Sequence, residues 1–386
     1  MTAAAVEQDR RRPVLITGGA GFIGTNLADR LLRQGRRVLI YDSLGRAGAE
    51  QNLRWLRAHH GARRLDVEIA DVLSTERLRA AVADAGTVFH LAGQVAVTTS
   101  LDDPWRDFAT NAGGTLTLLE ALRHGGGGKR LVFTSTNKVY GAIGDIDLAE
   151  TATRYTPEGA LARRGIDEGR PLRFHSPYGC SKGSADQYVL DYARSFGLAA
   201  AVFRMSCIYG PHQFGTEDQG WVAHFLISAL RGEPLAIYGD GLQVRDILFV
   251  EDLVEAMLAA QQRIDSVGGQ AFNVGGGPAN TISLIELLDL IADLVGERPL
   301  AHLEPWRTAD QRYYVSDTRK LRAAVGWRPR TSVQAGVAAL LDWLVANQVT
   351  ANELRASRIR ASDVRARDIG ASVDRASVTR ASGVAS

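Results

Sequence analysis

The chain has 386 residues, of which 45% are hydrophobic and 23% charged, proportions that exclude a disordered or fibrous protein and are typical of a globular enzyme of one or two domains. The formal net charge is +2, from 45 lysines and arginines against 43 acidic residues, so the composition indicates no nucleic-acid or membrane partner.

The cysteine content and the N-terminus bear on the compartment. The sequence contains two cysteines, Cys180 and Cys207. Two cysteines form neither a disulfide framework nor a zinc-binding pattern, so we expect no metal site. The first ten residues lack the apolar core of a signal peptide, and no apolar run approaches the roughly 20 residues that span a bilayer. These features predict a cytoplasmic protein in a reducing compartment.

From residue 14 to residue 205, short apolar strands alternate with helical segments. Such alternation predicts an α/β fold with a doubly wound parallel sheet of the Rossmann type. The expected strands are 14–17, 37–41, 65–69, 87–91, 129–134 and 199–205, and the expected helices are 25–34, 74–84, 111–123 and the segment around Tyr178.

Beyond residue 210 the pattern becomes mixed and predicts a smaller α/β lobe that covers the open end of the sheet. We therefore expect a first domain over residues 1–205, to which residues of about 235–275 return, and a second lobe over residues 206–346. The expected helices are 221–230, 251–262, 283–295, 321–324 and 333–346, and the expected strands are 235–238 and 271–274.

The C-terminal segment is a tail of near-perfect five-residue repeats such as RASRI and RASDV. A period of five fits neither a helix face nor a strand face, and the repeats lack aromatic side chains. Such a segment cannot bury enough apolar surface to offset its ordering entropy. We expect residues 351–386 to be disordered or weakly helical, with no catalytic role.

A glycine-rich turn, Gly19-x-Gly21-x-x-Gly24, follows the first strand and opens the first helix. Glycines at this spacing let the backbone approach a pyrophosphate at the helix N-terminus. Asp42 ends the next strand, where a carboxylate can accept hydrogen bonds from ribose hydroxyls and would repel a 2′-phosphate. The pattern predicts a dinucleotide cofactor and favours NAD, while the nearby Arg46 leaves NADP open.

Tyr178 and Lys182 are four residues apart, so they share one face of a helix. A phenol normally ionises near pH 10, and an ammonium beside it favours the phenolate and lowers the pKa. The pair is therefore a candidate for taking a proton from a sugar hydroxyl while a hydride leaves the same carbon.

These motifs resemble, in order, the extended short-chain dehydrogenase/reductase family, also called the NAD-dependent epimerase/dehydratase family. The segments that carry the resemblance are TGGAGFIG, Asp71-Val72, HLAGQ, TSTNKVYG and YGCSK, and it extends from about Val14 to Trp343. It implies that the first domain binds NAD. The cofactor-binding residues it implies are Gly18, Gly21, Phe22, Ile23, Gly24, Asp42, Asp71, Val72, Leu91, Ala92, Gly93, Asn111, Tyr178 and Lys182.

The resemblance also assigns the third catalytic residue, since TSTNKVYG places Thr136 at the position of the family's catalytic Ser or Thr. In the 4,6-dehydratases of this family an Asp-Glu pair follows that residue and supports the elimination of water. Here the two positions are Asn137 and Lys138. This departure disfavours dehydration and favours an epimerase.

Within the family, the segments around Tyr178 and around Trp221 are most similar to 2-epimerases of CDP-deoxyhexoses. The implied reaction inverts C2 through a transient 2-keto sugar, with tightly held NAD and no metal. Cys207 and His212 depart from that group, which leaves the sugar open. The nucleotide-sugar-binding residues that the resemblance implies are Thr136, Asn137, Lys138, His175, Ser176, Gln213, Gln219, Arg245 and Arg307.

Other functions remain open from the sequence. Within the family they are a C4 epimerase, a dehydrogenase or a dehydratase acting on another nucleotide sugar. A protein of this fold could also be a non-catalytic NAD-binding scaffold, which the intact Thr136, Tyr178 and Lys182 disfavour. Family members often dimerise through the helix that carries the catalytic tyrosine, so a homodimer is expected.

Overall fold

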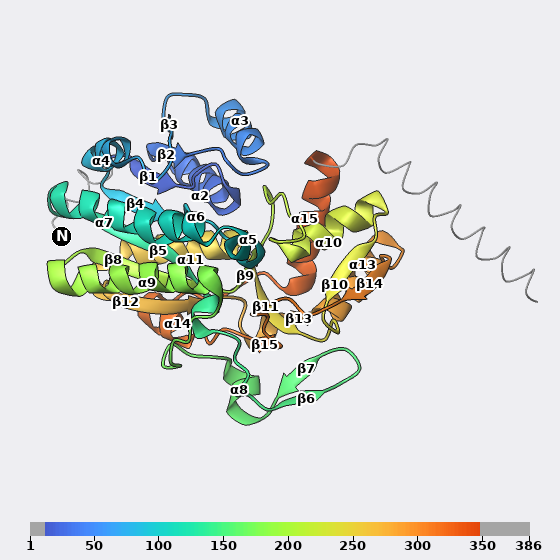
Figure 1. The fold of residues 1–386 in the computed structure, drawn as a ribbon. Helices are drawn as coiled ribbons and strands as arrows, with labels where there is room; N and C mark the ends of the chain where they lie inside the picture. The colour runs from blue at the N-terminus through green and yellow to red at the C-terminus, as the bar shows by residue number, and fades with distance from the viewer. Residues whose placement is uncertain (1–11, 348–386) are drawn as a thin grey trace, which may run out of the picture.

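The computed structural model describes residues 12–347, which form a large lobe built on a parallel sheet and a smaller mixed lobe beside it (Figure 1). The predicted repeat tail lies outside the described residues. Among residues 12–347, no helix is both long enough and apolar enough to cross a bilayer.

The large lobe contains a seven-stranded sheet in which every neighbouring pair is parallel. All four residues of Val14–Thr17 and all four of Thr87–His90 are buried, as expected of strands that are covered on both faces. The predicted doubly wound Rossmann fold is thus confirmed. Across the sheet the strands are β12 (Gln270–Val274), β8 (Ala199–Met205), β5 (Arg130–Thr136), β4 (Thr87–His90), β1 (Val14–Thr17), β2 (Val38–Asp42) and β3 (Leu65–Ile69).

Helices cover both faces of this sheet, and each face has its own buried apolar cluster. One face carries α2 (Phe22–Arg33), α3 (Ala49–His60), α11 (Val250–Gln262), α12 (Ile264–Val267) and α14 (Arg319–Val325). The other face carries α4 (Thr75–Asp84), α7 (Gly114–His124) and α9 (Ser176–Phe196). Before α7 the chain forms α5 (Val97–Asp102), α6 (Pro104–Phe108) and a π-helical turn, Ala109–Gly113.

The position of β1 determines where a ligand can bind. After β1 the chain moves to β2 and β3 on one side, and then returns to β4 on the other side of β1. In open α/β sheets such a reversal leaves a crevice at the carboxyl ends of the two central strands. The glycine turn that follows β1 and the HLAGQ segment that follows β4 therefore meet at one edge of the sheet.

The smaller lobe is built on β11, which pairs with β9, β13 and β15, and on a separate two-stranded pair of β10 and β14. Helices α10, α13 and α15 pack on these strands and form a third apolar cluster. Its elements are β9 (Cys207–Tyr209), α10 (Trp221–Arg231), β10 (Leu235–Tyr238), β11 (Val244–Phe249), η3 (Pro278–Asn280), β13 (Thr281–Ser283), α13 (Leu284–Val295), β14 (Ala301–Glu304), β15 (Tyr313–Tyr314) and α15 (Val333–Asn347).

A long segment between β5 and α9 leaves the large lobe and contacts the smaller one (Figure 1). Arg154 on this segment binds Glu286 of α13 through two hydrogen bonds, and Tyr155 binds Asp240. The segment therefore links the two lobes immediately before the helix that carries Tyr178. It contains η2 (Asn137–Tyr140), β6 (Leu148–Glu150), β7 (Tyr155–Pro157) and α8 (Gly159–Arg164).

The structure differs from the sequence-based expectation in several elements. Helix α3, which ends in the run NLRWLRAHH, and strand β11 were not expected, and α2 begins at Phe22, three residues before the expected start. The helix expected over 111–123 begins with a π-helical turn instead of a regular one. Of the residues expected to return to the first domain, 250–274 lie against the large sheet, whereas β10 and β11 lie in the smaller lobe.

Candidate active site

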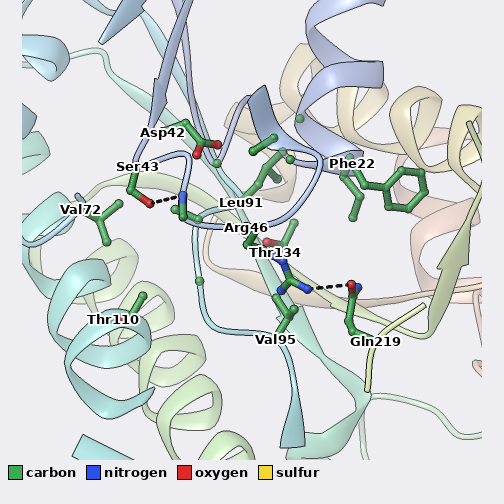
Figure 2. Close-up of a pocket in the computed structure, with 18 of the residues that line it drawn as sticks. Phe22, Asp42, Ser43, Arg46, Val72, Leu91, Val95, Thr110, Thr134 and Gln219 are labelled. Carbon is green, nitrogen blue, oxygen red and sulfur yellow. Dashed lines mark hydrogen bonds between the residues drawn. The ribbon is translucent and has the colours of Figure 1, made fainter. Parts of the chain in front are cut away.

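A pocket opens at the carboxyl ends of β1, β2 and β4, and it is lined by residues from both lobes (Figure 2). Most of the residues predicted to bind a cofactor line this one pocket, although they come from separate segments of the chain. They are Gly18, Gly21, Phe22, Ile23, Gly24, Asp42, Asp71, Val72, Leu91, Ala92, Gly93, Tyr178 and Lys182.

The glycine turn forms a backbone cradle in which side chains would not fit. Gly18 has a φ of +71°, and a Cβ there would lie 2.7 Å from the backbone nitrogen of Ala92. A Cβ on Gly24 would lie 2.3 Å from the carbonyl oxygen of Gly18. The N-terminus of α2 follows, and no side chain caps its free N–H groups. These features fit the pyrophosphate of a dinucleotide, which binds free N–H groups at a helix N-terminus.

Asp42 lies beside this cradle at the end of β2. Its carboxylate accepts hydrogen bonds from the backbone nitrogens of Ala20, at 3.0 Å, and Leu44, at 2.8 Å, so its orientation is fixed. The Arg46 guanidinium is directed away from Asp42 and donates to Gln219 at 3.1 Å (Figure 2). Arg46 therefore does not form the cationic site beside Asp42 that a 2′-phosphate would need, which favours NAD.

Asp71 and Val72 border the other end of the pocket. The Asp71 carboxylate accepts a hydrogen bond from the Leu73 backbone nitrogen at 2.9 Å. The Val72 side chain packs against Gly114, where a Cβ would lie 2.6 Å from Val72 Cγ2. Asn111 was predicted to bind the cofactor but does not line the pocket. It is buried behind Gly93, and its Oδ1 accepts a hydrogen bond from the Gln94 backbone nitrogen at 2.9 Å.

The three predicted catalytic residues lie together on α9 and at the end of β5. The Lys182 Nζ donates to the Thr134 carbonyl at 2.6 Å and lies 4.4 Å from the centre of the Phe133 ring. The Thr136 side chain lies near enough to the Tyr178 phenol to lower the phenol's pKa, and the Thr136 hydroxyl accepts a hydrogen bond from the Lys138 backbone nitrogen at 3.2 Å. Tyr178 and Thr136 are both buried, and a substrate hydroxyl that contacts both side chains could lose its proton to the Tyr178 phenol oxygen.

The expected lowering of the Tyr178 pKa is not found in the protein alone. Burial raises the pKa of Tyr178 to about 12, although the hydrogen bond from Thr136 and the charge of Arg46 oppose this rise. The expectation was wrong because it treated the helix face as solvated and placed the ammonium next to the phenol. In the structure Lys182 donates to the strand carbonyl instead, and burial lowers its own pKa to about 8.

Asn137 and Lys138 follow Thr136, and Lys138 belongs to a half-buried charged cluster. The Lys138 Nζ donates to the Ala309 carbonyl at 3.2 Å and lies 3.7 Å from the Asp310 carboxylate. Arg245 donates to the same carboxylate at 2.7 Å. Lys138, Arg245 and Asp310 therefore contribute two cations and one carboxylate.

Burial raises the pKa of Asp310, but Arg245 and Lys138 together hold that pKa below its usual value. The carboxylate therefore stays ionised and is a poor proton donor.

The remaining residues predicted to bind a substrate lie at different places. Gln213 and Gln219 line the pocket, whereas Thr136, Asn137, Lys138 and Arg245 lie outside the set of lining residues. Arg307 binds Glu217 and lies 3.7 Å from the centre of the Tyr238 ring. His175 is exposed and Ser176 half-buried at the start of α9, where the Ser176 hydroxyl accepts a hydrogen bond from the Gly179 nitrogen.

Asn52 lines the pocket but was missed by the sequence analysis, because it belongs to α3, which meets the loop after β9. Asn52 donates to the carbonyls of Ala20 and His212, each at 3.2 Å, and so joins the glycine turn to that loop. The Phe214 ring packs directly against Gly48, so a side chain at position 48 would collide with it. In the sequence, Gly48 and the spacing of Leu53 and Leu56 were the signals that could have predicted α3. Within residues 12–347, no group of three or more His, Cys, Asp or Glu side chains could hold a metal ion.

Comparisons with known proteins agree with this geometry. The model of the NAD dependent epimerase/dehydratase family matches residues 14–275. The CDP-paratose 2-epimerase of Salmonella typhi is 44% identical over 335 residues, which are 86% of this chain and 98% of that protein.

Two further relatives have other activities in their names. The dTDP-glucose 4,6-dehydratase of Xanthomonas campestris pv. campestris (strain B100) is 32% identical over 355 residues, which cover 86% of this chain and 93% of that protein. The crystal structure of the UDP-glucose 4-epimerase of Thermus thermophilus in complex with NAD has a TM-score of 0.72 and 32% identity, covering 87% of this chain and all of that one.

The substitution Asp42→Asn tests the cofactor preference. We expect NAD to bind at least about tenfold more weakly, because charge-assisted hydrogen bonds to ribose are lost, and the preference for NAD over NADP to shrink. Isothermal titration with both dinucleotides measures this. Asp66→Asn, which removes an exposed carboxylate paired with Arg37, is the control, and an unchanged NAD-to-NADP ratio in Asp42→Asn would contradict the assignment.

Proposed function

The chain belongs to the NAD-dependent epimerase/dehydratase family, and we propose that it inverts C2 of a CDP-deoxyhexose through a transient 2-keto sugar. The observation that carries this proposal is the site around Thr136. The hydroxyl of Thr136 and the phenol of Tyr178 are in place for oxidation, while Lys138 stands where a dehydratase would need an acid. Asp310, the carboxylate that contacts Lys138, is held ionised by its two cations and cannot protonate a leaving hydroxyl.

The backbone cradle of Gly18 and Gly24 and the fixed carboxylate of Asp42 would hold the cofactor. Bound NAD supplies reversible hydride acceptance, which no protein side chain provides. The large lobe therefore carries the cofactor, and residues of the smaller lobe and the linking segment carry the nucleotide sugar.

The side chains then need to handle only one proton. Tyr178 takes the proton of the sugar hydroxyl at its phenol oxygen, and Thr136 orients that hydroxyl by a hydrogen bond. At neutral pH Lys182 is below its pKa of about 8 and remains largely an ammonium, which donates to the Thr134 carbonyl in the wall of the pocket. The same proton returns to the sugar oxygen after the carbonyl carbon has been reduced from its other face.

The nucleotide sugar is bound by cations of the smaller lobe and the linking segment. Lys138 and Arg245 share one carboxylate, so this cluster retains a net positive charge that suits a diphosphate. Arg307, which lies at the Tyr238 ring, is paired with Glu217 and lies 3.6 Å from the Asp218 carboxylate, so it would have to exchange these partners to bind a phosphate. The choice of CDP and of C2 is supported by the 44% identity to the CDP-paratose 2-epimerase of Salmonella typhi.

The reaction is tested by turnover of a CDP-deoxyhexose in deuterated water. We expect the C2 epimer to form without solvent deuterium at C2, because the carbon-bound hydrogen is returned directly. Nuclear magnetic resonance of the product measures this. Deuterium at C2 would refute direct return, loss of water would indicate a dehydratase, and stoichiometric release of NADH would indicate a dehydrogenase.

Tyr178→Phe should lower turnover by about 10²–10⁴-fold, which is the usual contribution of a general base, while the folded protein still binds NAD. Turnover and NAD content are measured on the same preparation. Tyr188→Phe, which changes an exposed tyrosine on the same helix, should be active. Full activity of Tyr178→Phe would remove the tyrosine from the mechanism.

We also propose that the protein is a homodimer. Helices α5 and α6 pack against α9, and they expose apolar side chains that a monomer would leave in water. Trp105 is 84% exposed and Phe108 is 55% exposed on α6, and Phe196 is 54% exposed at the end of α9. Exposed aromatic residues that border one long helix support an interface made by two copies of the same surface.

Trp105→Glu should convert the dimer to a monomer, because it would bury a carboxylate on each side of the interface. Sedimentation velocity of the purified protein measures the change. Leu303→Glu, which changes an exposed leucine on β14 of the smaller lobe, is the control and should leave the dimer intact. A wild-type protein that sediments as a monomer would contradict the proposal.

A further inference from the structure

A buried carboxylate lies beneath the catalytic helix and has no role in the reaction described above. Asp107 lies on the short helix α6 and is only 1% exposed. A buried carboxylate is costly unless it is hydrogen-bonded, so its partners indicate what it does.

Both oxygens of Asp107 accept hydrogen bonds from neutral side chains. Ser181, which lies between Tyr178 and Lys182 on α9, donates its hydroxyl to Oδ2. Asn111 of the π-helical turn donates its Nδ2 to Oδ1 at 3.2 Å. Because each oxygen faces a donor, the geometry fits the ionised carboxylate.

The same contacts continue to the loop that borders the cofactor pocket. Asn111 Oδ1 accepts a hydrogen bond from the Gln94 nitrogen at 2.9 Å, directly after Gly93. Asp107 is thus connected through Asn111 to the pocket and through Ser181 to the catalytic helix. The π-helical turn places Asn111 between the two, as such turns often do near functional sites.

The charged groups around Lys182 show why this carboxylate matters. Burial lowers the pKa of Lys182, while Asp186 and Asp107 raise it. Asp186 lies one turn further along α9 and is bound by two Arg204 nitrogens, each at 2.9 Å, so much of its charge is compensated.

The other titratable neighbours of Lys182 are neutral at pH 7. His90 on β4 has a pKa lowered to about 3 by burial and by Lys182, and Tyr178 has a pKa raised to about 12, mainly by burial. Burial raises the pKa of Asp107, while the Ser181 hydrogen bond and the charge of Lys182 oppose this rise. Asp107 is bonded only to neutral donors, so no arginine compensates its charge as Arg204 compensates that of Asp186.

We propose that Asp107 is a positioning residue of this active site: its carboxylate fixes Ser181 and the turn of α9 that carries Lys182, and its charge keeps Lys182 an ammonium despite burial. The importance of that ammonium rests on the proposed function, in which Lys182 contacts the cofactor in the pocket that it lines. The effect on Lys182 itself does not depend on any substrate.

The test is a pH titration of Lys182 in the NAD-bound full-length protein, wild type against Asp107→Asn. The sequence contains four lysines, Lys129, Lys138, Lys182 and Lys320, so ¹³C-lysine labelling gives few resonances. The signal of Lys182 is assigned by its loss in Lys182→Met.

We expect the titration midpoint of Lys182 to fall by roughly one pH unit in Asp107→Asn, because loss of a nearby negative charge disfavours the ammonium. The other lysine signals should stay in place. Glu120→Gln is the matched control, since it also removes a carboxylate that binds α9, through the Tyr192 hydroxyl at 2.6 Å, at the far end of the helix. An unchanged midpoint, or an equal shift in Glu120→Gln, would overturn the proposal.

If Asp107→Asn does not fold, as judged by circular dichroism, Asp107→Ser replaces it, and the same shift is expected because serine is also neutral. With an active substrate, the alkaline limb of the pH–rate profile should move to lower pH by the same amount. A shifted Lys182 titration in a protein that turns over no CDP-sugar would uphold the role of Asp107 and refute the proposed function instead.

Discussion

The hydrogen bond from Lys182 to the Thr134 carbonyl is the contact on which the site depends. It holds the catalytic helix α9 against the end of β5 and directs the ammonium to the strand rather than to the neighbouring phenol. Thr136, two residues later on the same strand, then lies within hydrogen-bonding reach of Tyr178. One helix–strand contact thus sets the relative positions of all three reactive side chains.

This contact places charged groups where water does not reach, and the surrounding structure compensates for them. Arg204 binds Asp186, Asp107 accepts hydrogen bonds from Ser181 and Asn111, and the cluster of Lys138, Arg245 and Asp310 neutralises itself in part. A buried charge without partners would cost several kcal/mol, so these networks also fix the geometry of the site.

Much of the fold and of the cofactor site could be predicted because both follow local sequence patterns. The glycine turn, Asp42 and the Tyr178–Lys182 spacing each lie within one short segment, and the structure brings them to one pocket. Asn52 could not be predicted in this way. It reaches the pocket only because α3 and the loop after β9, which carries His212 and Phe214, meet above the glycine turn.

The sequence by itself determined the parallel sheet and the dinucleotide cradle, and it pointed to the residues that we propose for proton transfer, since apolar periodicity and fixed spacings encode these features. The tertiary structure decided the electrostatics. Burial raises the pKa of Tyr178 although a lysine lies one turn away, and Arg46 points to Gln219 rather than to the ribose site beside Asp42. These outcomes depend on desolvation and on side-chain direction, which arise only when distant segments pack together.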